Sequence, residues 1–303
     1  MNTDRRHFTH ATLRLVAALA AGTGPAWSAE PQKNRGPRPP WAQIERDAHG
    51  RLGVAVLDTA DGRLAGHRLH ERFPLCSTFK WLAAAMVLAR VDAGAERLDR
   101  RIAYGAEALV PHSPVTGPPA GRGGLTLAEL CEATITVSDN TAANLILAEH
   151  GGPASLTRYA RSLGDARTRL DRTEPALNEA TPGDPRDTTT PAAMAGALRA
   201  ALLGDALSAA SRAQLQRWME ATRTNLKRLR ADLPEGWRLG SKTGTGARGT
   251  TNDVGVYWPP GRPPIVVAVY LTATSAPEAD RQWAIARVAR WVTRGELAPP
   301  QPG

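Results

Sequence analysis

Hydrophobic and polar positions along the chain predict strands near both ends and helices between them. An Asp61-Gly62 dipeptide between two apolar stretches is typical of a tight hairpin. The expected strands are Leu52–Leu57, Arg63–Leu69, the stretch that contains Lys242, Asp253–Trp258 and Ile265–Thr272. Because these strands come from both ends of the chain, we expect them to pair in one antiparallel sheet of five strands.

Helical periodicity and capping residues account for most of the remaining chain. The segment Ser77–Val91 is apolar on nearly every side, which predicts a buried helix. Thr126-Leu127-Ala128-Glu129 has the pattern of a capping box. The other expected helices are Pro40–His49, Pro153–Leu163, Thr190–Gly204, Ser211–Thr222 and a terminal helix with Ile285, Val288, Ala289 and Val292 on one face. We therefore expect a two-lobed α+β (α/β) fold, in which N- and C-terminal helices flank the sheet and the central helices form an all-helical lobe.

The first 28 residues have the pattern of an export signal. Arg5-Arg6 precede an apolar run, Leu13–Ala21, and small residues follow at Ala26 and Ser28. The arginine pair is compatible with a twin-arginine signal. The run is too short for a permanent membrane anchor. We therefore interpret it as a signal that is cleaved after Ser28, and we expect an exported, periplasmic protein. A Pro-rich linker over 29–39 and a tail over 296–303 complete the ends.

Composition limits the possible partners. The 303 residues include 38 Lys and Arg against 29 Asp and Glu, a net charge of +9. No run of basic residues exceeds two, and aromatic residues do not alternate with arginines, so no nucleic-acid partner is expected. Two cysteines exclude a disulfide scaffold, and the seven histidines contain no zinc-hydrolase cluster. We expect a monomer that needs no metal and no cofactor.

A serine and a lysine stand three residues apart at the start of the buried helix, in Ser77-Thr78-Phe79-Lys80. This spacing places the hydroxyl and the amine on one helix face. A serine needs a neighbouring base to become a nucleophile, and a lysine in a low-dielectric site can lose its proton near neutrality. By itself the motif is more often a capping serine followed by an incidental lysine.

Two further motifs change that interpretation. Ser138-Asp139-Asn140 offers a second hydroxyl for proton transfer and an amide, that of Asn140, for binding substrate or Lys80, although all three residue types also cap helices. Lys242-Thr243-Gly244 lies on an expected inner strand, where a glycine allows close backbone approach. The N–H of Thr245 can then complete an oxyanion hole. Three such motifs in this order indicate an acyl-transfer serine enzyme.

These motifs resemble those of the class A serine β-lactamases, and the resemblance covers about residues 40–293. Glu174-Pro175-Ala176-Leu177-Asn178 is similar to the family's Glu-x-x-x-Asn sequence on an Ω-loop, here expected at about 168–187. The resemblance implies that the α/β lobe comprises 40–72 and 220–295 and that the helical lobe comprises 73–219. It also implies a β-lactam as the small-molecule substrate.

The family resemblance also implies a role for each matching residue. Ser77 would attack the lactam carbonyl, and the N–H groups of Ser77 and Thr245 would hold the oxyanion. Ser138 would pass a proton to the lactam nitrogen, with Lys242 beside it. Either Lys80 or Glu174 would be the acylation base, and this stays open. The remaining matches would bind substrate or the hydrolytic water: Asn140, Asn178, Thr243 and Gly244.

Some positions depart from the family pattern. The arginine that many relatives carry after the Lys-Thr-Gly motif is replaced by Thr251, so Arg228 is the expected carboxylate-binding residue, with Arg281 and Arg248 as weaker candidates. His112 stands where relatives place an aromatic wall of the cleft, and it is as suited to packing as to titration.

The cysteines also depart from the family pattern. Cys131 lacks the family's usual partner, because that position is Ala84. The carbapenem-hydrolysing relatives bridge the residue before the nucleophile, here Cys76, to a cysteine at the position of Gly246. The resemblance therefore implies that Cys76 and Cys131 are both reduced.

Two other functions share the serine–lysine chemistry. A cell-wall D,D-carboxypeptidase or transpeptidase would be inhibited by lactams, and a lactam sensor would stay acylated. Neither is expected to keep Glu174 and Asn178, and a sensor needs a membrane anchor.

Overall fold

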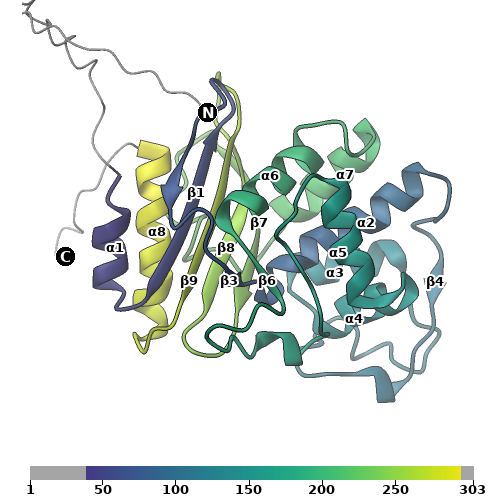
Figure 1. Ribbon diagram of the computed structural model, residues 1–303. Coiled ribbons are helices and arrows are strands. Elements are labelled where there is room, and N and C mark those ends of the chain that lie inside the picture. Colours follow the sequence, from purple (N-terminus) through teal and green to yellow (C-terminus); the bar gives the residue numbers. More distant parts are fainter. Residues whose placement is uncertain (1–38, 295–303) are drawn as a thin grey trace, which may run out of the picture. The chain divides into compact units, whose positions relative to one another are not determined.

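The structure is a computed structural model that describes residues 39–294 (Figure 1). The predicted signal, most of the linker and the tail therefore lie outside the described residues. No helix in the described part is long and apolar enough to cross a membrane. One five-stranded sheet has the order β2-β1-β9-β8-β7, and each neighbouring pair is antiparallel. Its strands are β1 (Arg51–Asp58), β2 (Leu64–His67), β7 (Arg238–Thr245), β8 (Thr251–Trp258) and β9 (Ile265–Thr272).

The sheet joins the two ends of the described chain, as the sequence predicts. β1 pairs with β9 along its whole length, from Arg51 opposite Thr272 to Asp58 opposite Ile265. β9 is buried at every position, since both faces of the sheet are covered. β-branched and aliphatic residues suit such a strand because they pack well on a pleated surface.

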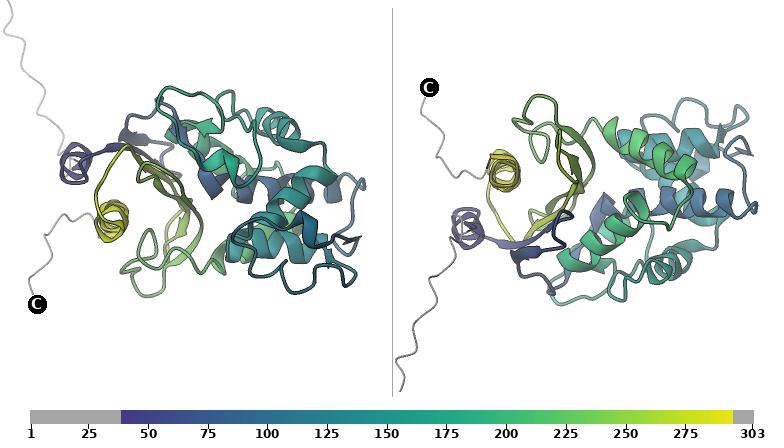
Figure 2. Two further views of the ribbon diagram at one scale, coloured as in Figure 1. Left: turned by 90° about the horizontal axis from the view of Figure 1, so that it is seen from below. Right: turned by 90° about the horizontal axis from the view of Figure 1, so that it is seen from above.

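Two helices cover one face of the sheet (Figure 2). They are α1 (Trp41–Asp47) and α8 (Glu278–Arg294), and they also contact each other, with the rings of Trp41 and Trp291 4.8 Å apart. Ile285 and Val288 of α8 are fully buried against this face. The helical spacing of these residues had predicted this packing.

The remaining helices lie on the opposite side of the sheet (Figures 1 and 2). They are α2 (Phe79–Asp92), α3 (Leu127–Thr136), α4 (Asn140–Glu149), α5 (Gly152–Ser162), α6 (Pro191–Leu202) and α7 (Ala209–Glu220). α2 is buried from Phe79 through Leu88 and contacts α3, α4, α5 and α7, as expected for a helix that is apolar on all sides. α6 packs on β1, β8 and β9, and α7 packs on β7, so the helices bury the inner face of the sheet.

Side-chain caps set where several of these helices begin. Thr126 and Glu129 form the predicted capping box at the start of α3. Asp139 caps α4, Thr190 caps α6 and Ser208 caps α7, each by accepting a backbone N–H. α7 begins at Ala209 rather than at the predicted Ser211, because Ser208 caps it. Ser208 had not been recognised as a cap in the sequence.

Short elements appear that the sequence did not predict. Within the helical lobe, β3 (Phe73–Pro74) pairs with β6 (Thr188–Thr189), and β4 (Arg101–Ile102) pairs with β5 (Leu125–Thr126). Three 3₁₀ turns occupy Cys76–Thr78, Ala106–Ala108 and Ala176–Asn178. Two- and three-residue elements have no periodicity that a sequence pattern can reveal.

Candidate active site

The nucleophile candidate lies on a 3₁₀ turn that leads directly into α2. Ser77 is 9% exposed, whereas Lys80 in the first turn of α2 is fully buried. β7 lies against this turn, and a Cβ at Gly244 would be only 2.9 Å from the carbonyl oxygen of Leu75. Gly244 therefore lets the Lys242-Thr243-Gly244 strand approach the serine, as its place in the motif had predicted.

Lys80 is the centre of the hydrogen-bonding network. Its Nζ donates to Ser138 O (2.8 Å), Ser138 Oγ (3.2 Å) and Asn140 Oδ1 (2.5 Å), and lies 3.0 Å from Glu174 Oε1. Burial lowers the pKa of Lys80, and the charge of Glu174 opposes that shift. Asn140 thus holds Lys80, one of the two roles considered for it.

Ser138 lies between two lysines. Its Oγ accepts from Lys80 Nζ and from Lys242 Nζ at 3.1 Å, and its backbone has a left-handed φ of 62°. Such a conformation is uncommon for a residue with a side chain, and it recurs at functional sites. Burial and the nearby charge of Lys80 hold the pKa of Lys242 well below its usual value. A hydroxyl between two such amines is well placed to relay a proton.

Glu174 contacts the nucleophile from the Ω-loop. Ser77 Oγ donates to Glu174 Oε1 at 3.1 Å, and Asn178 Nδ2 donates to Glu174 Oε2 at 2.5 Å. The carboxylate is 2% exposed. Asn144 of α4 fixes the backbone at this point, because it accepts the N–H of Glu174 and donates to its carbonyl oxygen. Asn144 was not predicted, although its spacing four residues after Asn140 puts both on one helix face.

The Ω-loop is closed at its neck by a partly buried ion pair. Arg172 Nε donates to Asp187 Oδ2 at 2.6 Å, and Asp187 Oδ1 accepts the N–H groups of Asp171 and Arg172. Arg169 and Thr188 add an isolated β-bridge. These contacts hold the loop that carries Glu174 and Asn178 against the helices.

The end of β7 carries the candidate carboxylate-binding groups. Arg228 is 5% exposed and donates to Gly244 O (2.9 Å), Asn252 O (2.8 Å) and Thr245 Oγ1 (2.8 Å). Thr251, which replaces the strand arginine of many relatives, pairs with Thr245 in the sheet. The structure therefore places the Arg228 guanidinium at the end of β7, in contact with Thr245.

The other expected residues occupy the rim of this region. Thr243 is 5% exposed, and its hydroxyl contacts that of Thr224 at 2.6 Å. Arg248 is exposed in the β7–β8 turn, and Arg281 is half-buried on α8. His112 is exposed, and its Nε2 donates a 2.9 Å hydrogen bond to the carbonyl oxygen of Val137.

Both cysteines are buried free thiols, as expected. Burial raises the pKa of each thiol, which makes both unreactive. A Cβ at Gly246 would lie 2.5 Å from Cys76 Sγ. Gly246 therefore stands where a cysteine would be needed to form a disulfide bond with Cys76. Titration of the denatured, unreduced protein should find two thiols, and finding none would contradict the structure.

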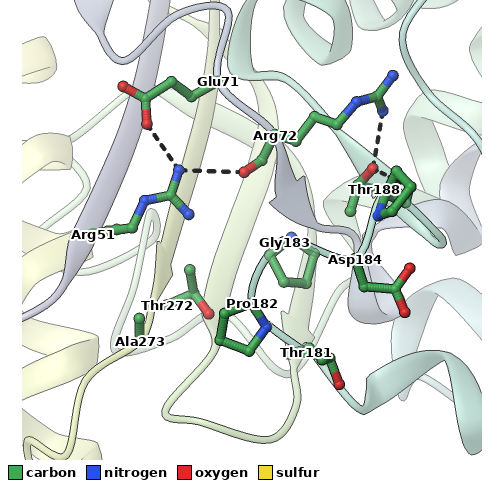
Figure 3. Close-up of a pocket in the computed structure, with 13 residues that line it drawn as sticks. Arg51, Glu71, Arg72, Thr181, Pro182, Gly183, Asp184, Thr188, Thr272 and Ala273 are labelled. Atoms are coloured by element: carbon green, nitrogen blue, oxygen red, sulfur yellow. Dashed lines mark hydrogen bonds and ion pairs between the residues drawn. The ribbon is translucent and has the colours of Figure 1, made fainter.

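Outside this site, the described residues offer no second cluster with evident chemistry. No group of three His, Cys, Asp or Glu side chains in the described part is arranged to hold a metal. A cavity of about 410 Å³ lies between the Ω-loop and the start of β1 (Figure 3). Its charged side chains already have partners: Arg51 contacts Glu71, Arg72 contacts Thr188, and Asp184 contacts Arg186.

Comparison with known proteins agrees with this geometry. The model of the β-lactamase enzyme family matches residues 41–294. A β-lactamase of Streptomyces fradiae is 49% identical over 88% of this chain and 88% of its own. The carbapenem-hydrolysing β-lactamase KPC of Klebsiella oxytoca is 47% identical over 84% of this chain and 87% of its own.

Solved structures show the same relationship. An ancestral class A β-lactamase is 64% identical, with a TM-score of 0.83 over 84% of this chain and 98% of that one. A class A β-lactamase from Rhodopseudomonas palustris, described as putative, is 58% identical with the same TM-score and coverage. The chain belongs to the class A β-lactamase family. It is a β-lactam hydrolase, and this activity gives resistance to β-lactam antibiotics.

Proposed function

We propose that the protein hydrolyses penicillins and cephalosporins through an acyl-enzyme on Ser77. The observation that carries this proposal is the direct contact of three groups: Ser77 Oγ with Glu174 Oε1, and Glu174 Oε1 with Lys80 Nζ. A hydroxyl beside a buried amine and a buried carboxylate has a base within hydrogen-bonding reach.

In the acylation step, Ser77 Oγ attacks the lactam carbonyl carbon and its proton passes to Lys80 or Glu174. The N–H groups of Ser77 and Thr245 hold the oxyanion. The C–N bond of the lactam then breaks, and Ser138 donates a proton to the leaving nitrogen. Ser138 regains a proton from the ammonium form of a neighbouring lysine, which its contacts with Lys80 and Lys242 support.

In the deacylation step, Glu174 removes a proton from a water molecule that attacks the ester carbonyl. The ester C–O bond breaks, and Ser77 Oγ takes up the proton that Glu174 had removed from the water. Asn178 supports this role twice, because its Nδ2 donates to Glu174 and its Oδ1 is a buried acceptor without a partner among the described residues. An unpaired buried acceptor is costly unless a donor such as water reaches it.

The remaining groups bind the substrate. The strand edge of Thr243, Gly244 and Thr245 would bind the substrate backbone, and Lys242 and Arg228 would attract its carboxylate. Asn140 would hold Lys80 and contact the substrate side chain. We further propose that the protein is a monomer. Its site would lie between an α/β lobe (40–72 and 220–295) and a helical lobe (73–219). Residues 1–28 would direct export of the protein to the periplasm, where it would have no permanent membrane anchor.

Brief incubation with a chromogenic cephalosporin tests the function. We expect many turnovers per enzyme molecule, because Glu174 renews the serine. A single stoichiometric burst would instead support a penicillin-inhibited carboxypeptidase or transpeptidase, or a lactam sensor.

Arg228→Ala should raise KM for penicillins more than it lowers kcat, because the carboxylate is bound alike in the ground and transition states. The lost charge-assisted contact is worth about 1.5–3 kcal/mol. Steady-state kinetics should be compared with those of Arg63→Ala, a control at an exposed position between β1 and β2. Unchanged kinetics for Arg228→Ala would shift the carboxylate role to Arg281.

Carbapenem hydrolysis should be weak relative to that of penicillins. Cys76 is a free thiol beside Gly246, so the bridge implied for carbapenem-hydrolysing relatives is missing. The measurement is kcat/KM for a carbapenem and for benzylpenicillin under the same conditions. Equal values would contradict the expectation.

A further inference from the structure

A buried polar cluster lies on the face of β7 and β8 that points away from the catalytic serine. Side chains alternate along a strand, so Lys242 and Gly244 face the helical side, whereas Thr243 and Thr245 face the other way. Asp253 of β8 lies directly opposite Thr243 in the register and shares its face. This carboxylate is fully buried, and no step proposed above uses it.

The segment over 222–230 covers this face through hydrogen bonds. Leu229 N donates to Asp253 Oδ2 at 3.0 Å, and Asn225 Nδ2 donates to Ser241 Oγ at 2.8 Å. The residue beside Leu229 is Arg228, whose guanidinium reaches the end of β7. Asp253 and Arg228 are therefore held by the same short stretch of backbone.

Each of these two residues is the main counter-charge of the other. Arg228 is nearly buried, and no carboxylate in the part of the chain that the structure describes lies within ion-pair distance of it. The largest favourable charge acting on Arg228 is that of Asp253, and the largest acting on Asp253 is that of Arg228. A buried cation without a counter-charge would be strongly disfavoured.

We propose that Asp253 is a positioning residue for the carboxylate-binding end of the cleft, supplying the counter-charge that keeps the Arg228 guanidinium beneath Thr245. It touches no reacting atom and acts through Arg228. The inference rests on the proposed role of Arg228 in binding the substrate carboxylate.

The proposal predicts a pH dependence of substrate binding. Burial raises the pKa of Asp253 to about 6, against the opposing effect of Arg228. The other charged or titratable groups that act on this pair are Lys242 of β7, Tyr257 of β8, Cys76 of the 3₁₀ turn, and Glu278 and Arg281 of α8. As the pH falls through about 6, Asp253 loses its charge, and KM for a carboxylate substrate should rise.

The raised pKa of Asp253 also predicts how the stability of the fold depends on pH, and here the charged form is the unfavourable one. A carboxyl group whose pKa is raised by folding stabilises the native state most at low pH, and that contribution is lost as the pH rises through the folded pKa. Ionised Asp253 is therefore unfavourable for folding above about pH 6.

The experiment compares benzylpenicillin with its methyl ester, which lacks the carboxylate charge. In Asp253→Asn, kcat/KM for the acid should fall about 3- to 30-fold through KM, and the value for the ester should stay the same. Asp232→Asn is the matched control, because it removes an equal charge from an exposed position four residues after Arg228. It should leave the ratio of acid to ester unchanged.

Equal effects of Asp253→Asn on acid and ester, or no effect on either, would overturn the inference. Arg228→Ala separates this failure from failure of the proposed carboxylate site. If Arg228→Ala lowers the acid-to-ester ratio and Asp253→Asn does not, only the inference fails; if Arg228→Ala leaves the ratio unchanged, the role of Arg228 fails. Should Asp253→Asn not fold, the parent enzyme decides: KM must rise below about pH 6 for the acid alone, and a parallel rise for the ester overturns the inference.

Discussion

Glu174→Gln is expected to lower penicillin turnover by about 10²–10⁴, the usual contribution of a general base. Glutamine keeps the shape of the side chain and its contact with Asn178 but cannot accept a proton from water. The loss should fall mostly on deacylation. Rapid mixing with a chromogenic cephalosporin should therefore show a burst of one equivalent, followed by a slow steady rate.

Glu179→Gln is the matched control for this variant. Glu179 lies on the same Ω-loop, and its side chain is 54% exposed and paired with Arg172. Arg172 keeps its buried contact with Asp187, so the loop should stay closed in the control. Parental turnover in Glu174→Gln would remove Glu174 as the deacylation base, and the case against a transpeptidase would lose its main support.

Lys80→Met should also reduce turnover by about 10²–10⁴, but by slowing acylation. Methionine fills the space of the lysine's carbon chain and lacks the amine that contacts Ser138, Asn140 and Glu174. Because the first step becomes limiting, no burst should precede the slow steady rate. Rapid mixing under the same conditions measures this contrast with Glu174→Gln.

The Lys80→Met variant also leaves Glu174 as an unpaired buried charge. Breaking such a pair costs about 3–5 kcal/mol of stability, so its melting temperature should fall. Circular dichroism at the assay temperature must therefore show a folded protein before the rates are compared. A burst in folded Lys80→Met like that of Glu174→Gln would place the role of Lys80 in deacylation instead.

The sequence predicted elements whose patterns extend over several residues. β9 has eight buried positions of apolar or β-branched type, and α2 is apolar on all sides, so both were found close to their observed bounds. Two kinds of element were not predicted: the 3₁₀ turn that carries Ser77, and the two-residue strands. Their conformation depends on packing against distant segments, such as β7 against Leu75.

The candidate site shows the same division. Ser77, Lys80 and Ser138 belong to compact motifs whose chemistry can be read from their spacing. Asn144 and Asp253 belong to no motif that was recognised, and their importance appears only when the chain is folded. Asn144 fixes the backbone of a residue 30 positions away, and Asp253 of β8 acts on Arg228 of the segment over 222–230.

Mass spectrometry of Glu174→Gln after a short pulse of benzylpenicillin tests the central claim most directly. The intact protein should gain the mass of one ring-opened penicillin, and digestion should place the adduct on the peptide that contains Ser77. The double variant Ser77→Ala, Glu174→Gln should gain no mass. An adduct on another peptide, or an adduct in the double variant, would contradict the account of Ser77 as the acylated nucleophile.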